Sequence, residues 1–153
     1  MKIREYTFDD AEGHAEVHRN SVKGIASEDY RDEVIEVWAS KEPEDTPLPE
    51  EKVRFVAETD KGEVVGFSDY NKETKELSGL YIKPDFSGKG IGQKLLQKAE
   101  QDARKNGLSR LWCKATATAK DFYQKHGYKI IEETNHELED GIEMKVYKME
   151  KKL

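Results

Sequence analysis

Cysteine and long apolar runs are both scarce in this sequence, and each scarcity excludes a class of protein. Only one of the 153 residues is a cysteine, Cys113, which excludes an internal disulfide framework and a cysteine-based structural zinc site. The apolar runs are too short to cross a bilayer, and the N-terminal MKIREYTFDD lacks the apolar segment of a secretory signal. We therefore expect a cytoplasmic protein that does not associate with a membrane.

Positive charge is also in short supply. The 26 lysines and arginines are outnumbered by 32 aspartates and glutamates, which gives a formal net charge of −6. Binding to DNA or RNA depends on basic side chains that replace the counterions of the phosphates, so we expect no nucleic-acid partner. A chain of this length can bury roughly 70% of its unfolded surface in one core. We expect a single domain over residues 1–153.

The N-terminal third reads as one strand followed by helices. Residues 2–6 alternate polar and apolar side chains, as a half-buried strand does. The spacing of apolar residues predicts helices over 11–19 and 28–40, with a connection over 21–27. Three of the four prolines lie within 41–51, and because proline fixes φ and lacks an amide donor, we expect a loop there.

Strands dominate the middle of the chain. Three runs that read as strands, 53–58, 64–69 and 77–82, are separated by turn sequences at 60–62 and 71–74. Short turns join antiparallel neighbours, so these segments predict an antiparallel meander.

Beyond Pro84 the apolar spacing changes to that of a helix, which Asn106-Gly107 ends. The predicted buried face of this helix consists of Ile91, Leu95, Leu96, Ala99 and Ala103.

The C-terminal third is expected to add a strand at 109–113, a short helix at 119–126 and strands at 128–132 and 142–149. A strand–helix–strand passage makes the strands at 77–82 and 109–113 parallel neighbours. The sequence therefore predicts an α/β fold with one mixed, mostly antiparallel sheet and helices on both faces.

The most informative segment joins the strand that ends at Ile82 to the following helix. Its turn holds three glycines, Gly88, Gly90 and Gly92. The start of a helix has unpaired N–H groups and a partial positive charge, and glycines let this backbone approach a phosphate closely. The turn predicts an anion-binding site made mostly of main chain.

Two other phosphate-binding motifs are excluded by spacing, which disfavours a nucleotide-binding protein. No Lys-Ser or Lys-Thr follows these glycines, as a P-loop requires. A dinucleotide fingerprint needs a glycine three residues after Gly92, where the chain has Leu95.

The segment Gly88-Lys89-Gly90-Ile91-Gly92 resembles the pyrophosphate loop of the GNAT superfamily of acetyl-CoA-dependent N-acetyltransferases, whose motif is Q/R-x-x-G-x-G/A. Gly90 and Gly92 match its two glycines, whereas Ser87 replaces the usual Gln or Arg and removes one side-chain contact. A second segment, Ala119-x-x-Phe122-Tyr123-x-x-x-Gly127-Tyr128, is similar to the family's A-x-x-F-Y-x-x-x-G-F/Y signature. The order of the elements agrees along nearly the whole chain.

The resemblance implies a GNAT fold, in which the central parallel strands splay apart, and direct attack of a primary amine on the thioester of acetyl-CoA. The acceptor amine would belong to a small molecule or a peptide. Tyr123 matches the general acid that protonates the leaving thiolate, and Phe122 is expected in the core. The cofactor would contact Leu80, Tyr81, Ile82, Ser87, Gly88, Lys89, Gly90, Ile91, Gly92, Gln93 and Thr116.

The base that deprotonates the amine is left open between two carboxylates and the solvent. Glu76 lies where some relatives keep a catalytic glutamate, which acts directly or through water, and Asp69 on the neighbouring strand is the other candidate. Either could instead be an ordinary surface carboxylate of a strand. Tyr30 and Trp38 could wall an acceptor pocket or pack in the core. The acidic charge balance favours a cationic acceptor.

Neither a metal nor an obligatory protein partner is indicated. His14 and His18 lie one helical turn apart, but no third ligand is in view, so we expect both on the helix surface and no metal site. The resemblance is compatible with a homodimer that pairs through the C-terminal strands. The alternative to an enzyme is a noncatalytic acyl-CoA-binding or sensing module built on the same fold.

Overall fold

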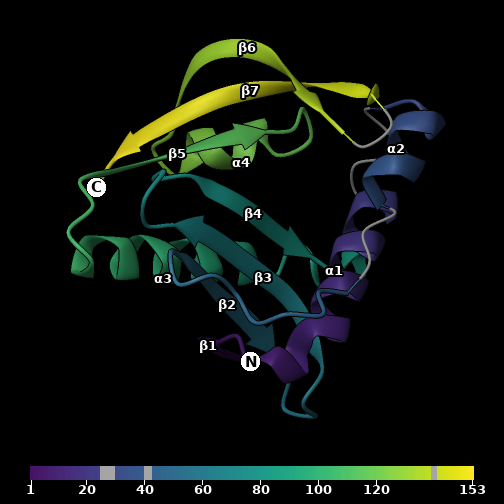
Figure 1. The fold of residues 1–153 in the computed structure, drawn as a ribbon, viewed down its shortest axis with the longest axis vertical. Helices are drawn as coiled ribbons and strands as arrows, with labels where there is room; N and C mark the ends of the chain where they lie inside the picture. The colour runs from purple at the N-terminus through teal and green to yellow at the C-terminus, as the bar shows by residue number, and fades with distance from the viewer. Residues whose placement is uncertain (25–29, 40–42, 139–140) are drawn as a thin grey trace.

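The computed structural model describes residues 1–24, 30–39, 43–138 and 141–153 (Figure 1). Two short 3₁₀ helices, Phe8–Asp10 and Pro84–Phe86, accompany the regular elements. These elements are β1 (Lys2–Glu5), α1 (Ala11–Gly24), α2 (Asp32–Ala39), β2 (Lys52–Glu58), β3 (Val64–Asn71), β4 (Leu77–Ile82), α3 (Ile91–Lys105), β5 (Arg110–Ala115), α4 (Lys120–Lys125), β6 (Lys129–Glu137) and β7 (Glu143–Lys152).

The strands form two hydrogen-bonded sheets, in the orders β1-β2-β3-β4 and β5-β7-β6. Neighbours within each sheet are antiparallel. β4 and β5 are parallel, and they meet at an isolated bridge between Glu76 and Trp112, where the Trp112 amide donates to the Lys75 carbonyl at 3.0 Å. The expected α/β arrangement with a splayed central parallel pair is thus present, but the one mixed sheet is divided into two sheets that an isolated bridge joins. Figure 1 shows β4 and β5 close together at their starts and diverging toward α1 and α2.

Helices cover both faces of the four-stranded sheet, as expected. The apolar stripe predicted for α3 is fully buried and packs with Phe55 and Ala57 of β2. On the other face Val17 of α1 packs with Val56 and Phe67. Side chains alternate between the faces of a strand. Val56 therefore faces the core beside α1, whereas Phe55 and Ala57 face the core beside α3.

The first helix is longer than the sequence predicted. α1 continues through Gly24, so the expected connection at 21–27 was wrong for residues 21–24, and the remainder lies outside the described residues. Burial explains the extension, because Val22 packs with Val34, Ile35 and Trp38 of α2. Of the predicted second helix at 28–40, the structure has Asp32–Ala39; the prediction was wrong for residues 30 and 31, which are not helical, and residues 28, 29 and 40 lie outside the described residues.

The two histidines of α1 are buried, which corrects the expectation that they lie on the surface. His14 is 0% exposed and His18 is 7% exposed. The His14 ring lies 4.1 Å from the ring of Phe67, and the His18 ring lies 5.0 Å from that of Tyr81. Their spacing of one helical turn places both on the face of α1 that packs against the sheet.

Two further features of the described part of the chain concern membranes and metals. None of its helices has both the length and the apolar character that a bilayer crossing requires. None of its groups of His, Cys, Asp and Glu is arranged to hold a metal ion.

Candidate active site

A cleft of about 430 Å³ opens where β4 ends, the glycine turn begins α3, and α4 lies opposite. Its lining is predominantly apolar. Its lining includes Ser21, Val22, Trp38, Leu80, Tyr81, Ile82, Phe86, Ser87, Gly88, Gly90, Ile91, Gly92, Gln93, Thr116, Thr118, Ala119, Phe122, Tyr123, Lys125 and His126.

The glycine turn has the backbone that an anion site needs. Gly88 and Gly90 have φ angles of 74° and 79°, the left-handed region that disfavours other residues. Gly90 is the N-cap of α3, so the amides of Ile91, Gly92 and Gln93 belong to the first turn, where the helix supplies no acceptor. These three residues line the cleft. The partial positive charge of the helix start is therefore directed into it.

Two side chains of this turn are used locally. The Ser87 hydroxyl donates to the Pro84 carbonyl at 2.8 Å, so this serine closes the turn. The Lys89 ammonium lies 5.3 Å from the centre of the Phe86 ring, and Lys89 is not among the cleft-lining residues. The polar groups that the turn offers to the cleft are therefore mainly main-chain amides.

β4 provides the wall that leads from the glycine turn toward the centre of the molecule. Leu80, Tyr81 and Ile82 all line the cleft. They pair with β3 on one side only, because β5 has already parted from β4. Successive backbone groups of a strand point to alternate sides, so part of the β4 backbone faces the gap.

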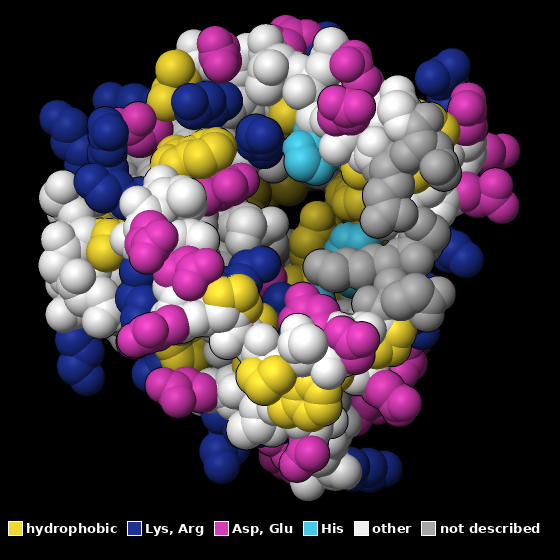
Figure 2. All heavy atoms as spheres, viewed as in Figure 1, with side chains coloured by type: hydrophobic (Ala, Val, Ile, Leu, Met, Phe, Trp, Pro, Cys, Tyr) yellow, Lys and Arg dark blue, Asp and Glu magenta, His cyan; other side chains and the backbone are white. Residues whose placement is uncertain are grey.

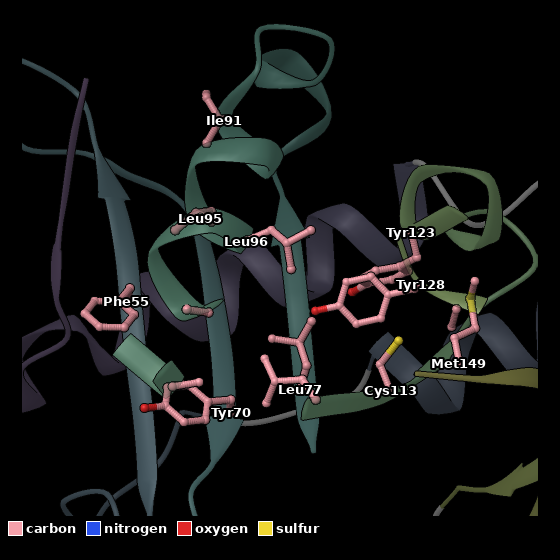
Figure 3. Close-up of a cluster of buried hydrophobic side chains, with 14 of the residues drawn as sticks. Phe55, Tyr70, Leu77, Ile91, Leu95, Leu96, Cys113, Tyr123, Tyr128 and Met149 are labelled. Atoms are coloured by element: carbon pink, nitrogen blue, oxygen red, sulfur yellow. The ribbon is translucent and has the colours of Figure 1, made fainter. Parts of the chain in front are cut away.

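Tyr123 reaches the cleft from α4 and is 6% exposed. Burial raises the pKa of its phenol well above the ordinary value, and the nearby Cys113 and Tyr81 raise it further. Burial also raises the pKa of the Cys113 thiol to about 12. Figure 3 shows Tyr123, Tyr128 and Cys113 together at one end of the main core, the cluster of buried side chains that packs against α3. This region disfavours negative charge, so the Tyr123 phenol keeps its proton at neutral pH.

Phe122 lies beside the glycine turn at the edge of the core. A Cβ added to Gly92 would lie 3.5 Å from the Phe122 ring, so the ring is a close neighbour of this glycine. Phe122 is partly buried, packs against the main core, and lines the cleft. The A-x-x-F-Y segment and the glycine segment thus come together in space.

A second, smaller pocket of about 80 Å³ shares Trp38, Tyr81 and Thr116 with the cleft. Figure 2 shows the molecule hollowed near the middle of one face, where histidine, basic and hydrophobic side chains meet. The remaining lining residues of the pocket come from β4, β5, β6 and β7 and the approach to β4. They are Glu76, Leu77, Ser78, Lys114, His136, Met144 and Val146.

The shared wall between the cleft and the pocket is aromatic. Trp38 is 9% exposed, and its ring lies 6.3 Å from that of Tyr81. Burial raises the pKa of the Tyr81 phenol to about 12. Tyr30 lines neither hollow: its hydroxyl donates to the Lys145 carbonyl at 2.8 Å and accepts from the Ala117 amide at 2.9 Å. Of the two aromatic residues considered for an acceptor pocket, Trp38 lies in its wall and Tyr30 joins backbone segments.

Thr116 lines both the cleft and the smaller pocket, and it also has a structural role. Its hydroxyl accepts from the Ala119 amide at 3.2 Å, and its carbonyl accepts from the amides of Ala119 and Lys120. It therefore fixes the start of α4, the helix that carries Tyr123.

The two carboxylates considered as the base have different environments in the structure. Glu76 is partly exposed and lines the smaller pocket. Asp69 is 4% exposed and accepts from the Arg54 guanidinium at 2.5 Å and 2.9 Å. Arg54 is itself buried and also donates to Glu44, which fastens the proline-rich loop to the sheet. Asp69 lines neither hollow and belongs to a structural ion pair.

Sequence reasoning missed Lys114 and His136, which face Glu76 across the smaller pocket. They lie on β5 and β6, and they approach each other only because β7 pairs with both strands. No local spacing signals such a cluster.

The cleft thus brings together a helix start with unpaired amides, an open strand edge and a buried phenol, an arrangement that suits a transferase with an acyl-coenzyme A donor. The sequence profile of the acetyltransferase (GNAT) domain matches residues 26–153. The chain belongs to the GNAT superfamily and is an acyl-CoA-dependent N-acetyltransferase, as the sequence predicted. The noncatalytic alternative is disfavoured.

Two relatives are similar over most of the chain. A spermidine N(1)-acetyltransferase from Thermoplasma acidophilum is 31% identical over 143 residues, which cover 85% of this chain and 89% of the relative. A peptidyl-lysine N-acetyltransferase from Salmonella typhimurium is 32% identical over 133 residues, which cover 85% of this chain and 84% of that protein.

Solved structures agree on the fold. A GCN5-related N-acetyltransferase from Rhodopseudomonas palustris matches with a TM-score of 0.87 and 25% identity, over 99% of this chain and 95% of the other. The PaiA N-acetyltransferase from Thermoplasma acidophilum, in complex with coenzyme A, matches with a TM-score of 0.80 and 28% identity over 99% and 98% of the two chains.

The ion pair of Asp69 generates a first prediction. Asp69→Ala leaves the buried Arg54 with Glu44 as its remaining carboxylate partner, and breaking a buried ion pair costs about 3 kcal/mol. Urea unfolding should show this loss in the free energy of unfolding. Glu73→Ala, at an exposed turn, should change that free energy by no more than about 0.5 kcal/mol. A variant of unchanged stability that loses acetyl transfer would contradict the structural assignment of Asp69.

Proposed function

We propose that the cleft holds acetyl-CoA with its diphosphate against the amides of the glycine turn. The groups assigned to it are Ser87, Gly88, Lys89, Gly90, Ile91, Gly92 and Gln93, with the backbone of Gly90–Gln93 making the main contribution. The left-handed glycines and the unpaired first-turn amides support this assignment. Lys89 lies close enough in sequence to add positive charge from outside the cleft.

The pantetheine arm then follows Leu80, Tyr81 and Ile82 toward the gap. A chain with amide groups can pair with an open strand edge, as an added strand does. A backbone N–H of this segment would also face the thioester carbonyl and stabilise the oxyanion that forms on attack. Thr116, on the opposite wall, borders the same path.

The acceptor is proposed to enter through the smaller pocket and meet the thioester at the wall that both hollows share. This meeting of two hollows at Tyr81 and Thr116 is the observation that carries the proposal. Glu76 supplies negative charge that attracts an ammonium group. The spermidine and peptidyl-lysine enzymes act on substrates that carry primary aliphatic amines, so we assign this chemical class to the acceptor.

Tyr123 is the proposed general acid. Attack of the amine nitrogen forms the C–N bond and breaks the C–S bond, and the phenol gives its proton to the leaving thiolate. A thiolate released in this buried region is a strong base, because the same burial that affects Cys113 disfavours a charged sulfur. The proton transfer therefore does not require an acidic phenol.

Gly90→Val should remove acetyl-CoA binding. A β-branched residue is strained at φ 79°, and its side chain would occupy the space proposed for the diphosphate. Gly107→Val is the matched control, because Gly107 has φ 83° at the other end of α3 and also has nothing within 4 Å of an added Cβ. Calorimetric titration should show at least about 100-fold weaker binding for the first variant alone, a loss of about 2.7 kcal/mol. Equal affinities in two folded variants would exclude this turn as the phosphate site.

Tyr123→Phe should retain acetyl-CoA binding and lower kcat by about 100-fold or more, because general acid catalysis contributes on this scale. The readout is release of the free thiol with spermidine and with a lysine-containing peptide. Tyr128→Phe is the control, since that ring lies 5.4 Å from Tyr123 and does not line the cleft. Unchanged kcat in Tyr123→Phe would overturn the role of the phenol, and binding without turnover of any amine would favour the sensing module.

A further inference from the structure

The smaller pocket gathers polar groups on the side of the β4–β5 gap from which the acceptor would come. Three of them ionise: Glu76 ahead of β4, Lys114 on β5 and His136 on β6. Within the described part of the chain, no hydrogen bond or ion pair engages these three side chains. These three side chains are therefore available to a ligand.

The lining of this pocket brings the three ionisable groups around one hollow of about 80 Å³. The charges of Lys114 and Glu76 both act on the imidazole of His136, so the three groups lie near one another. An amino group that enters can therefore reach the carboxylate and the imidazole, directly or through water. The acceptor's carbon chain would extend outward along the exposed rim.

An aliphatic amine arrives protonated and must lose a proton before it can attack. Hydroxyl groups and an ammonium group cannot take this proton at neutral pH, which leaves the carboxylate and the imidazole. An imidazole is the stronger base of the two by about 2 pKa units in water. We propose that His136 is the base that deprotonates the acceptor amine, while Glu76 holds the ammonium form beside it. This inference rests on the proposed function of the smaller pocket.

His136 is exposed to solvent on one side, on a strand whose side chains are mostly exposed. Its partial burial and the positive charge of Lys114 lower the pKa of its imidazole, and Glu76 opposes them. β7 places Met144 opposite it in register, and α2 contributes Trp38, so neither of these elements adds a charge to the pocket. A histidine whose pKa lies below its ordinary value of about 6.5 is a free proton acceptor at pH 7.

The proton balance of the reaction closes with these groups. The ammonium gives one proton to a ring nitrogen of His136, which later releases it to solvent. After the C–N bond forms, the nitrogen loses a second proton, which replaces through water the one that Tyr123 gives to the thiolate. The products are the acetylated amine, the free thiol of coenzyme A and one proton in solution.

The test compares the pH dependence of kcat/KM with the titration of His136 followed by NMR in the whole protein, using spermidine and a lysine-containing peptide as acceptors. In the wild type, kcat/KM should fall as the pH drops through the pKa of His136, below about 6.5. Lys114→Gln removes a positive charge, so the NMR pKa and the acid limb should both move upward together. Lys148→Gln is the control, because Lys148 lies over the Trp112 ring and outside the pocket.

His136→Gln should lose this acid limb and lower kcat/KM by about 100-fold or more while acetyl-CoA binding persists. An acid limb that remains in His136→Gln, or that stays fixed when Lys114→Gln shifts the NMR titration, would overturn the role of His136 and leave the proposed function standing. A wild-type enzyme that acetylates no primary amine would instead overturn the proposed function, and this inference with it.

Discussion

The active site depends on how little backbone pairing joins β4 to β5. Beyond the bridge at Glu76 and Trp112 the two parallel strands diverge, and part of the β4 backbone faces the gap without a strand partner. Such unpaired groups are costly when buried and therefore favour a ligand that pairs with them. The same divergence creates the cleft on one side and the smaller pocket on the other, with Tyr81 and Thr116 between them.

The two hollows differ in their electrostatics, and the difference suits two partners of opposite character. The cleft begins at positive backbone amides and ends at a phenol that burial keeps protonated. It can hold an anionic donor at one end and protonate a leaving group at the other. The smaller pocket contains a carboxylate, an imidazole and an ammonium group, from Glu76, His136 and Lys114. In the proposed reaction the carboxylate attracts a cationic acceptor, the imidazole deprotonates it, and the two substrates react where the two hollows meet.

Local sequence patterns correctly predicted the features that depend on a single helix or turn. The period of the α3 stripe, the glycines at its start and the A-x-x-F-Y segment each report on one element, and the structure has those elements in place. The parallel pairing of the two central strands followed from the strand–helix–strand passage, whereas their splaying followed only from family resemblance. The GNAT assignment therefore needed two motifs in the correct order.

The errors and omissions involve contacts between distant segments. Asp69 was a candidate base until the structure placed Arg54 against it from the neighbouring strand. The buried histidines of α1 and the extension of that helix depend on packing against the sheet and α2. His136 joins Glu76 only through strand pairing across two sheets, so the acceptor side was the least predictable part of the site.

Amide hydrogen exchange along β4 tests most directly whether the open strand edge receives the donor. With acetyl-CoA at saturation, the amides within Leu80–Ile82 that face the gap should exchange more slowly, while those of the exposed strand β6 should keep their rates. Unchanged exchange throughout β4, under conditions where calorimetry shows the cofactor bound, would contradict the account.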